Sequence, residues 1–117
     1  MREPKLLLFD ILDCIMAINK HVACDKQEFY NSNLMQVYAL HMLQVIGEAL
    51  KNIPQHIKDS HPEIAWSKII GMRNIIVHGY FNIDNAELWN TITDDLPTLK
   101  EQVKAIMDEQ NWIYEPN

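Results

Sequence analysis

Apolar residues recur every three or four positions along most of this chain, which is the pattern of helices that bury one face. The first such stripe predicts a helix over residues 4–24, with Pro4 in its first turn. Asp10 and Asp13 fall off the stripe, so we expect them to be solvated. The stripe consists of Leu7, Ile11, Cys14, Ile15, Ile18 and Val22.

The next stretch predicts a short helical turn and then a long helix. Asp25 is a suitable cap for the turn over residues 26–31, and Asn33 for the helix over residues 34–57. We expect Pro54 to bend or end this helix. Its apolar positions include Leu34, Tyr38, Val45, Ala49 and Ile53.

A third helix is expected to begin at Trp66, after a loop over residues 58–65, and to run to Val77 or Gly79. Isoleucines form one side of this helix, with Arg73 among them. The other side is small and polar and consists of Ser67, Gly71, Asn74 and His78. The glycine on this polar side would let another helix approach closely.

The last helix is expected over residues 85–110, with Asp84 or Asn85 as its cap. Its apolar positions keep one register across Pro97, so the pattern predicts one long helix that is kinked at this proline. A break at the pair of aspartates just before the proline is the alternative. These apolar positions are Leu88, Ile92, Leu96, Leu99, Val103 and Ile106. An exposed tail is expected from about residue 110, in which Trp112 can fold back.

Short loops between these helices predict an all-α antiparallel bundle. The 117 residues allow a single domain over residues 1–117 with one core, and the three glycines argue against a β-rich fold. No apolar run approaches the ~20 residues of a membrane helix, and the first residues lack a signal-peptide pattern. We therefore expect a cytoplasmic protein without membrane contact.

Charge and cysteine content limit the possible functions. The net charge is −6, so a nucleic-acid substrate would have to meet a local positive site or the surface of a partner. If Cys14 and Cys24 both lie on the first helix, they are about 15 Å apart, which is too far for a disulfide. No cluster of cysteine and histidine suggests a metal site.

The candidate chemistry is concentrated in residues 72–80, which contain Arg73, Asn74, His78 and Tyr80. An arginine can hold a phosphate with two hydrogen bonds, and a histidine can exchange protons near neutral pH. Five residues of helix turn through about 140°, so Arg73 and His78 do not share a face, whereas Asn74 and His78 do. Arg73 and His78 converge only if the arginine reaches round, if the helix end unwinds, or if a second copy supplies the complement.

Structural roles are the alternatives for the same residues. Glu48 lies on an apolar face and needs a cationic partner, so it could form a salt bridge with Arg73. His78 could stabilise the C-terminus of a helix that Gly79 caps. Tyr80 could be a half-buried aromatic residue.

Arg73-Asn74-x3-His78-x-Tyr80 resembles the Arg-x4-His-x-Tyr motif of the HEPN superfamily, specifically of the HepT toxins of HepT–MntA toxin–antitoxin pairs. The resemblance covers about residues 5–107. The Arg-x4-His pair alone is a weak signal, but the pair, the tyrosine and three further segments in order are a strong one. These segments are Ile46-Gly47-Glu48-Ala49, Trp66 with Ile69-Ile70-Gly71, and Asp95-Leu96-Pro97-x-Leu99.

The resemblance implies a four- or five-helix HEPN bundle that forms a homodimer, in which two Arg-x4-His motifs line one composite cleft. It also implies a metal-independent endoribonuclease that needs no cofactor and acts on cellular RNA, with tRNA as a candidate. In the expected mechanism, His78 takes the proton from a ribose 2′-hydroxyl or protonates the leaving 5′-oxygen. Arg73 stabilises the charge on the phosphorane. Asn74 orients the histidine or the phosphate, and Glu48 is a supporting residue.

The resemblance further implies control by a MntA-type nucleotidyltransferase antitoxin, which transfers AMP from ATP to Tyr80. A bulky anion beside Arg73 would occupy the phosphate site and repel RNA. Two other functions stay open: a non-catalytic HEPN module that binds a nucleotidyltransferase partner or nucleotide, and a plain helical dimerisation domain in which Glu48 neutralises Arg73. Assembly beyond a dimer stays open as well.

Overall fold

The computed structural model describes residues 2–22, 25–77 and 82–116. Within these ranges the chain is helical and has no strand, only one isolated bridge, so the predicted all-α class is confirmed. None of the helices in these ranges is long and apolar enough to cross a bilayer.

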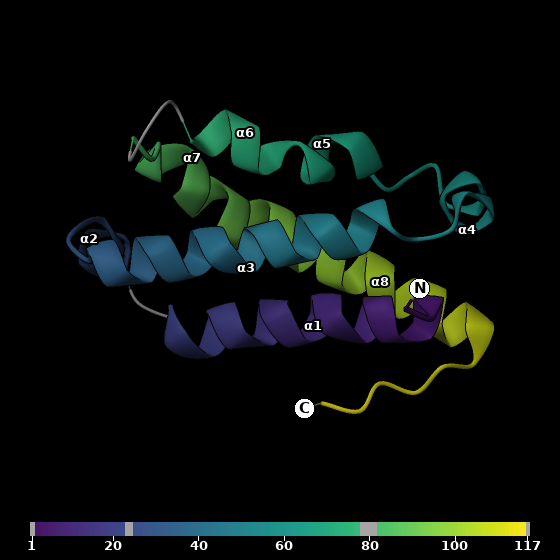
Figure 1. Cartoon of the computed structure of the whole chain (residues 1–117). Helices are drawn as coiled ribbons and strands as arrows, with labels where there is room; N and C mark the ends of the chain where they lie inside the picture. Colours follow the sequence, from purple (N-terminus) through teal and green to yellow (C-terminus); the bar gives the residue numbers. More distant parts are fainter. Residues whose placement is uncertain (1, 23–24, 78–81, 117) are drawn as a thin grey trace.

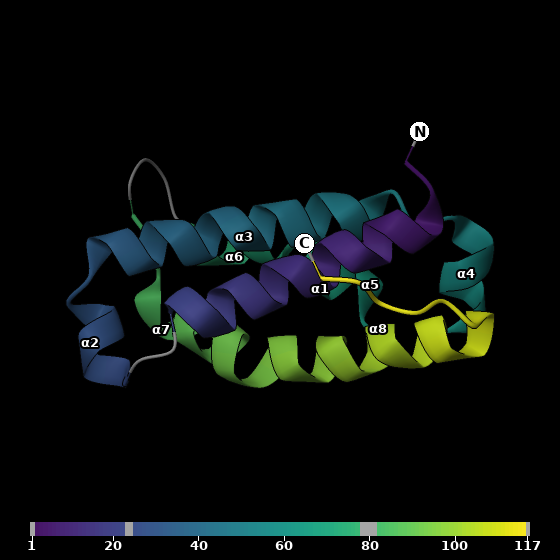
Figure 2. The same ribbon diagram turned by 90° about the horizontal axis from the view of Figure 1, so that it is seen from below.

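The helices form a bundle in which α1, α3, the α5–α6 segment and the α7–α8 segment alternate in direction (Figures 1 and 2). In Figure 1, α3 lies between α1 and the α5–α6 segment, and α8 runs behind it. The elements are α1 (Pro4–His21), α2 (Lys26–Tyr30), α3 (Asn33–Lys51), α4 (Gln55–Ser60), α5 (Trp66–Ile70), α6 (Met72–Ile76), α7 (Asn85–Asn90), the π-helical turn η1 (Thr91–Asp95) and α8 (Leu96–Gln110).

The core fills the space between α1, α3 and α8, and residues of α6 and α7 close one end. A fully buried leucine or isoleucine contributes roughly 1.5–3 kcal/mol, so these contacts are the main force that holds the helices in place. The largest fully buried side chains are Phe29, Leu8, Ile11, Leu12, Ile15, Ile18, Ile46, Leu50, Ile76, Leu88, Leu99 and Ile106.

The first helix begins with Pro4 as predicted, but it ends at His21 rather than at residue 24. Cys14 is buried on this helix. Its burial, helped by the charges of two aspartates on the same helix, raises the pKa of its thiol to about 11. Cys24 lies outside the described residues, so the expected absence of a disulfide stays a prediction.

Asp10 and Asp13 were expected to be solvated, and this is wrong, because both are half-buried and hydrogen-bonded. Asp10 accepts two hydrogen bonds from the guanidinium of Arg2, at 2.6 and 3.0 Å. Asp13 accepts one from the hydroxyl of Tyr114, at 2.5 Å. Their partners come from the chain ends, which a helical repeat does not reveal.

Two of the predicted helix caps are confirmed. The carboxylates of Asp25 and Asp84 each accept a hydrogen bond from the N–H three residues further on, at 2.8 and 3.0 Å. The cap of α3 is Ser32 rather than Asn33, since the hydroxyl of Ser32 accepts the corresponding bond at 3.1 Å. Serine and asparagine both cap helices well. The backbone conformation just before α3 decides which of these two neighbours does so.

The helix predicted over residues 34–57 is two helices. α3 ends at Lys51, before Pro54, and α4 occupies Gln55–Ser60. The predicted loop over residues 58–65 is therefore shorter than expected. Proline ends the helix here because it lacks the N–H that the next hydrogen bond needs.

The buried face of α3 is also different from the predicted one. Leu34 is 81% exposed, and Tyr38 and Val45 are only half-buried, although Ala49 and Ile53 are buried. Because α3 packs against α1 on one side and against α5 and α6 on the other, its apolar surface is wide, and the predicted stripe followed the edge of that surface. The centre of the buried face consists of Ala39, Leu43, Ile46, Gly47 and Leu50.

The third predicted helix is divided at Gly71 into α5 and α6. It ends at Ile76, and Val77 already has an extended backbone, with φ −98° and ψ 116°. The predicted end at Val77 or Gly79 is therefore too late.

Two helices of the chain approach each other closely at Gly47, whereas the approach of another helix to Gly71 is not seen among the described residues and stays a prediction for a second copy. A Cβ atom on Gly47 would lie 3.5 Å from the carbonyl oxygen of Ile70, so the backbones of α3 and α5 nearly touch. Around Gly71, the nearest described atom is a carbonyl oxygen of its own helical segment, that of Ser67 at 3.3 Å. The contact at Gly47 fixes the height of α5 along α3.

The last helical run covers the predicted residues 85–110, but its irregularity is not a kink at Pro97. The π-helical turn η1 precedes the proline, at the aspartate pair where the alternative placed a break. In this turn the N–H of Leu96 bonds to the carbonyl of Thr91. A proline ring collides with the carbonyl four residues earlier in a regular helix, and the wider turn relieves that collision.

The segment after α8 turns back along α1 (Figures 1 and 2). Asn111 ends the helix in the left-handed conformation, with φ 59°, and allows the reversal. Trp112 folds back as expected and is half-buried. Tyr114 is also half-buried, and its ring lies edge-on to that of Phe9 at 5.5 Å between centroids. The tail is thus less exposed than expected.

Candidate functional site

Helix α6 presents the first half of the motif to solvent. Met72 and Ile76 are 4% and 0% exposed, and they anchor the helix against α3 and α7. Residues four apart lie on one face of a helix, so the three residues between them point outward. Arg73 and Asn74 are exposed accordingly, and so is Ile75.

The guanidinium of Arg73 makes no hydrogen bond or ion pair with any of the described residues. In particular, it forms no salt bridge with Glu48, which is itself exposed. The alternative in which Glu48 neutralises Arg73 is therefore not observed. None of the described residues therefore occupies the five N–H donors of this guanidinium.

The second half of the motif, His78 and Tyr80, lies outside the described residues. The residues on either side of it are held together, since Val77 and Ile83 form an antiparallel bridge. The N–H of Asp84 also donates to the carbonyl of Ile76 at 2.7 Å. Both ends of the connection between α6 and α7 are thus fixed beside the exposed arginine.

The end of α6 changes the expected geometry of the motif. Asn74 and His78 were expected to share a helix face, but the helix stops at Ile76, so that argument does not apply. An unwound helix end was one of three ways to bring Arg73 and His78 together, and the extended backbone of Val77 is such an end.

The start of α7 carries a polar atom that the sequence analysis did not single out. The side-chain oxygen of Asn85 is buried and accepts no hydrogen bond from the described residues. Buried acceptors without a partner are uncommon and call for an explanation. Asn85 lies two residues after the bridge at Ile83, at the first position of α7. No sequence signal distinguishes it from an ordinary first-turn asparagine.

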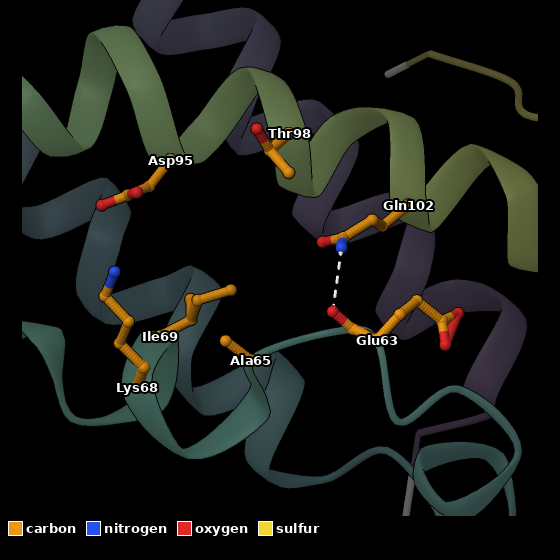
Figure 3. A pocket seen from close by; sticks show the side chains of 7 residues that line it. All are labelled: Glu63, Ala65, Lys68, Ile69, Asp95, Thr98 and Gln102. Carbon is orange, nitrogen blue, oxygen red and sulfur yellow. Dashed lines mark hydrogen bonds between the residues drawn. The ribbon is translucent and has the colours of Figure 1, made fainter.

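The Asp-Leu-Pro segment contributes to a different part of the molecule. Asp95 lines a cavity of about 220 Å³ between α5 and the start of α8, and Lys68 points toward it from the opposite wall (Figure 3). Gln102 closes one side by donating to the backbone carbonyl of Glu63 at 3.3 Å. Arg73 and Asn74 are not among the residues that line this cavity. Gln102 thus ties α8 to the loop before α5, and the Asp-Leu-Pro segment faces this cavity and not the described part of the motif.

A second cluster of polar side chains, which the sequence did not reveal, fixes the loop that leads into α5. His61 is buried, and its ring nitrogens lie 3.1 Å from Glu63 and 3.5 Å from Glu109. Its carbonyl accepts the indole N–H of Trp66 at 3.0 Å. The backbone N–H of Glu63 and the nearby His61 lower the pKa of the Glu63 carboxyl. These contacts tie the loop before α5 to the end of α8.

Within the described ranges, no three His, Cys, Asp or Glu side chains are grouped as a metal site requires. Among the described residues of the motif, Arg73 and Asn74 are exposed and neither side chain bonds to another described residue. Such a pair can bind an anion through the guanidinium and orient it through the amide N–H. It is suited to a phosphate group.

Comparison with known proteins gives a consistent result. The family model described as "Ribonuclease HepT-like" matches residues 11–106. A protein of Thermococcus cleftensis named "Probable ribonuclease HepT" is 40% identical over 107 residues, which cover 90% of this chain and 96% of the relative. No solved structure matches.

Two other relatives are similar over nearly their whole length. A protein of Methanocaldococcus jannaschii named "Putative RNase" is 32% identical over 108 residues, which cover 90% of this chain and 97% of the relative. One of Caldanaerobacter subterraneus subsp. tengcongensis with the same kind of name is 31% identical over 111 residues, 94% of this chain and 99% of the relative.

Proposed function

Because this chain belongs to the HepT-like ribonuclease family, we propose that it is a metal-independent endoribonuclease that acts in the cytoplasm as the toxin of a toxin–antitoxin pair. The exposed guanidinium of Arg73, which pairs with none of the described residues and stands on a helix anchored by Met72 and Ile76, is the observation that supports this most. An arginine without an internal partner keeps its donors for a phosphate.

The chemistry that we propose is an attack by the ribose 2′-hydroxyl on the adjacent phosphorus. His78 accepts the proton of the hydroxyl, the new O2′–P bond forms, and the bond from phosphorus to the 5′-oxygen breaks. A protonated histidine supplies the proton that the leaving 5′-oxygen needs. Arg73 balances the charge on the phosphorane, and Asn74 orients the phosphate. DNA lacks the 2′-hydroxyl and is not cut.

A homodimer is part of this proposal, with the motifs of both copies in one cleft. Two apolar side chains on the outer edge of α3 support it, since Leu34 is 81% and Val37 49% exposed. They lie three residues apart and thus on one face, and neighbouring exposed apolar side chains often mark an interaction surface. Replacing both by glutamate should yield a monomer in light scattering, and an unchanged mass would contradict this part.

Control by a MntA-type nucleotidyltransferase is the other part of the proposal. AMP on Tyr80 would place negative charge next to the phosphate site of Arg73 and so exclude RNA. Tyr80→Phe should keep RNA cleavage, gain no AMP mass with the antitoxin and ATP, and stay active. A Tyr80→Phe protein that the antitoxin still silences through AMP transfer would show that another residue is modified.

Incubation of the purified protein with total RNA in a chelator tests the enzymatic function. We expect cleavage that His78→Ala abolishes, because the general base is lost. A non-catalytic HEPN module is the second candidate, and the acidic net charge of −6 favours it. If no RNA is cut, or if His78→Ala cuts as fast as the unchanged protein, that candidate replaces the ribonuclease.

A further inference from the structure

The negative charge of this protein is concentrated in its C-terminal third. Residues 1–83 contain eight acidic and eight basic residues and are neutral, whereas residues 84–117 contain eight acidic residues against two lysines and carry the whole net charge of −6. The described residues of the range 84–117 form α7, η1, α8 and the tail. Of these elements α7, with Asp84 at its cap and Glu87 in its first turn, packs against α6, so an approaching RNA is repelled from the side of α7 and α8.

The outer edge of α3 changes in character along its length. Its exposed positions recur at intervals of three and four and form one row: Leu34, Val37, His41, Gln44, Glu48 and Lys51. The row is apolar at the N-terminal end of α3 and basic at the C-terminal end. There the ammonium of Lys58 on α4 donates to the carbonyl of Lys51 at 3.2 Å, so two lysines lie close together.

Along the axis of α3, Arg73 lies at the height of the middle of this row. The α5–α6 segment runs antiparallel to α3 (Figure 1), and Gly47 touches Ile70. Three residues beyond Ile70, Arg73 is displaced by about 4.5 Å toward the N-terminus of α3, which brings it level with Gln44. The apolar end of the row then lies on one side of the arginine and the two lysines on the other.

We propose that a single strand of RNA held at Arg73 runs along the outer edge of α3 to its C-terminal end, where Lys51 and Lys58 contact the phosphates. This proposal rests on the proposed ribonuclease function. Seven residues of helix separate Gln44 from Lys51, or about 10 Å, which a few nucleotides span. Lysines bind phosphate as point charges. Glu48 lies between the two ends and weakens the attraction, so Glu48→Gln should tighten binding.

Lys51→Gln provides the sharpest test. The side chain of Lys51 makes no hydrogen bond or ion pair with the described residues, so its replacement leaves the fold intact. Lys104→Gln, at an exposed position on α8, changes the net charge by the same amount and is the matched control. The double variants Lys51→Gln/Lys58→Gln and Lys100→Gln/Lys104→Gln enlarge the effect.

Binding of a short, fluorescein-labelled, 2′-O-methylated single-stranded RNA in chelator is measured by anisotropy at several salt concentrations. The 2′-O-methyl groups prevent cleavage, so only binding is observed. The Lys51/Lys58 double variant should bind severalfold more weakly, and the slope of log affinity against log salt should fall by roughly 0.7 per lysine. The Lys100/Lys104 variant should keep the affinity and the slope of the unchanged protein.

Equal weakening of the two double variants would overturn the proposal, because net charge and not position would then govern binding. No binding by the unchanged protein would overturn it as well. The proposed function can fail independently of this proposal. A protein that binds RNA through Lys51 but cuts none is not a ribonuclease, although the RNA path along α3 is then correct. A protein that cuts RNA and ignores Lys51→Gln is a ribonuclease whose RNA lies elsewhere.

Discussion

The two arginines of this chain have opposite surroundings. Arg2, at the start of α1, donates two hydrogen bonds to Asp10, and this carboxylate raises the pKa of the guanidinium. Arg73 makes no such contact with the described residues, although Glu48 is exposed on the neighbouring helix. A paired surface arginine belongs to the structure of the protein, whereas an unpaired one on an anchored helix is available for a ligand.

Removing the side chain that anchors the helix of Arg73 should cause the largest loss of unfolding free energy. Ile76→Ala removes a fully buried side chain beneath the arginine and should cost about 2–5 kcal/mol of unfolding free energy. Ile75→Ala, at the neighbouring position that is 50% exposed, should cost less than about 1 kcal/mol. Urea unfolding of both variants makes the comparison. Equal losses would mean that α6 is not held as the structure shows.

The geometry of the arginine can be tested without removing its charge. Arg73→Lys keeps the positive charge but loses the planar fork that binds phosphate through two hydrogen bonds. Cleavage should fall about tenfold, the size of one such hydrogen bond to a charged group. Single-turnover rates on a labelled RNA measure it. Full activity in this variant would show that charge alone suffices.

Tyr114→Phe tests a polar contact that stabilises the fold and binds no ligand. It removes the hydroxyl that donates to Asp13, and the unfolding free energy should fall by about 1 kcal/mol. Tyr30→Phe is the control, since the structure shows no hydrogen bond from that hydroxyl. An equal loss in Tyr30→Phe would show that the effect has nothing to do with the bond to Asp13.

The same contact predicts a pH dependence. Burial, and then the carboxylate of Asp13, raise the pKa of Tyr114 above its ordinary value. The folded state therefore favours the protonated phenol. The stability that this contributes should be complete below pH ~10, where the unfolded tyrosine is protonated, and should be lost as the pH rises further. Unfolding curves of the unchanged protein and Tyr114→Phe should then converge at alkaline pH.

Arg2→Ala should have the smallest effect. The side chains of Arg2 and Asp10 are 51% and 27% exposed, and solvent screens an ion pair at the surface, so that it contributes little stability. The thermal midpoint should shift slightly, and more at low salt than at high salt. A large loss of stability would mean that the pair holds the start of α1 and is not a minor surface contact.

Local features of the structure could be predicted from the sequence. Asp25 and Asp84 cap helices because their carboxylates meet the free N–H groups three residues further on, and Pro54 ends a helix because it has no N–H. Such effects depend on a few neighbouring residues. The same is true of the all-α class, which follows from apolar positions at helical spacing.

Contacts between distant segments could not be predicted. The hydroxyl of Tyr114 meets Asp13 across 101 residues of chain, and the exposed Leu34 depends on which neighbours α3 acquires. Whether Glu48 reaches Arg73 is likewise decided by the packing of α3 and α6. Residue types indicated the candidate arginine, but only the folded chain shows that it pairs with none of the described residues.

The central claim is that Arg73, unlike Arg2, serves a phosphate. The most direct test compares RNA cleavage in chelator by Arg73→Ala and Arg2→Ala, with thermal midpoints measured on the same samples. Arg73→Ala should cut RNA about 10²–10³-fold more slowly at an unchanged midpoint, while Arg2→Ala should cut at the full rate. Equal cleavage by the two variants would contradict the account.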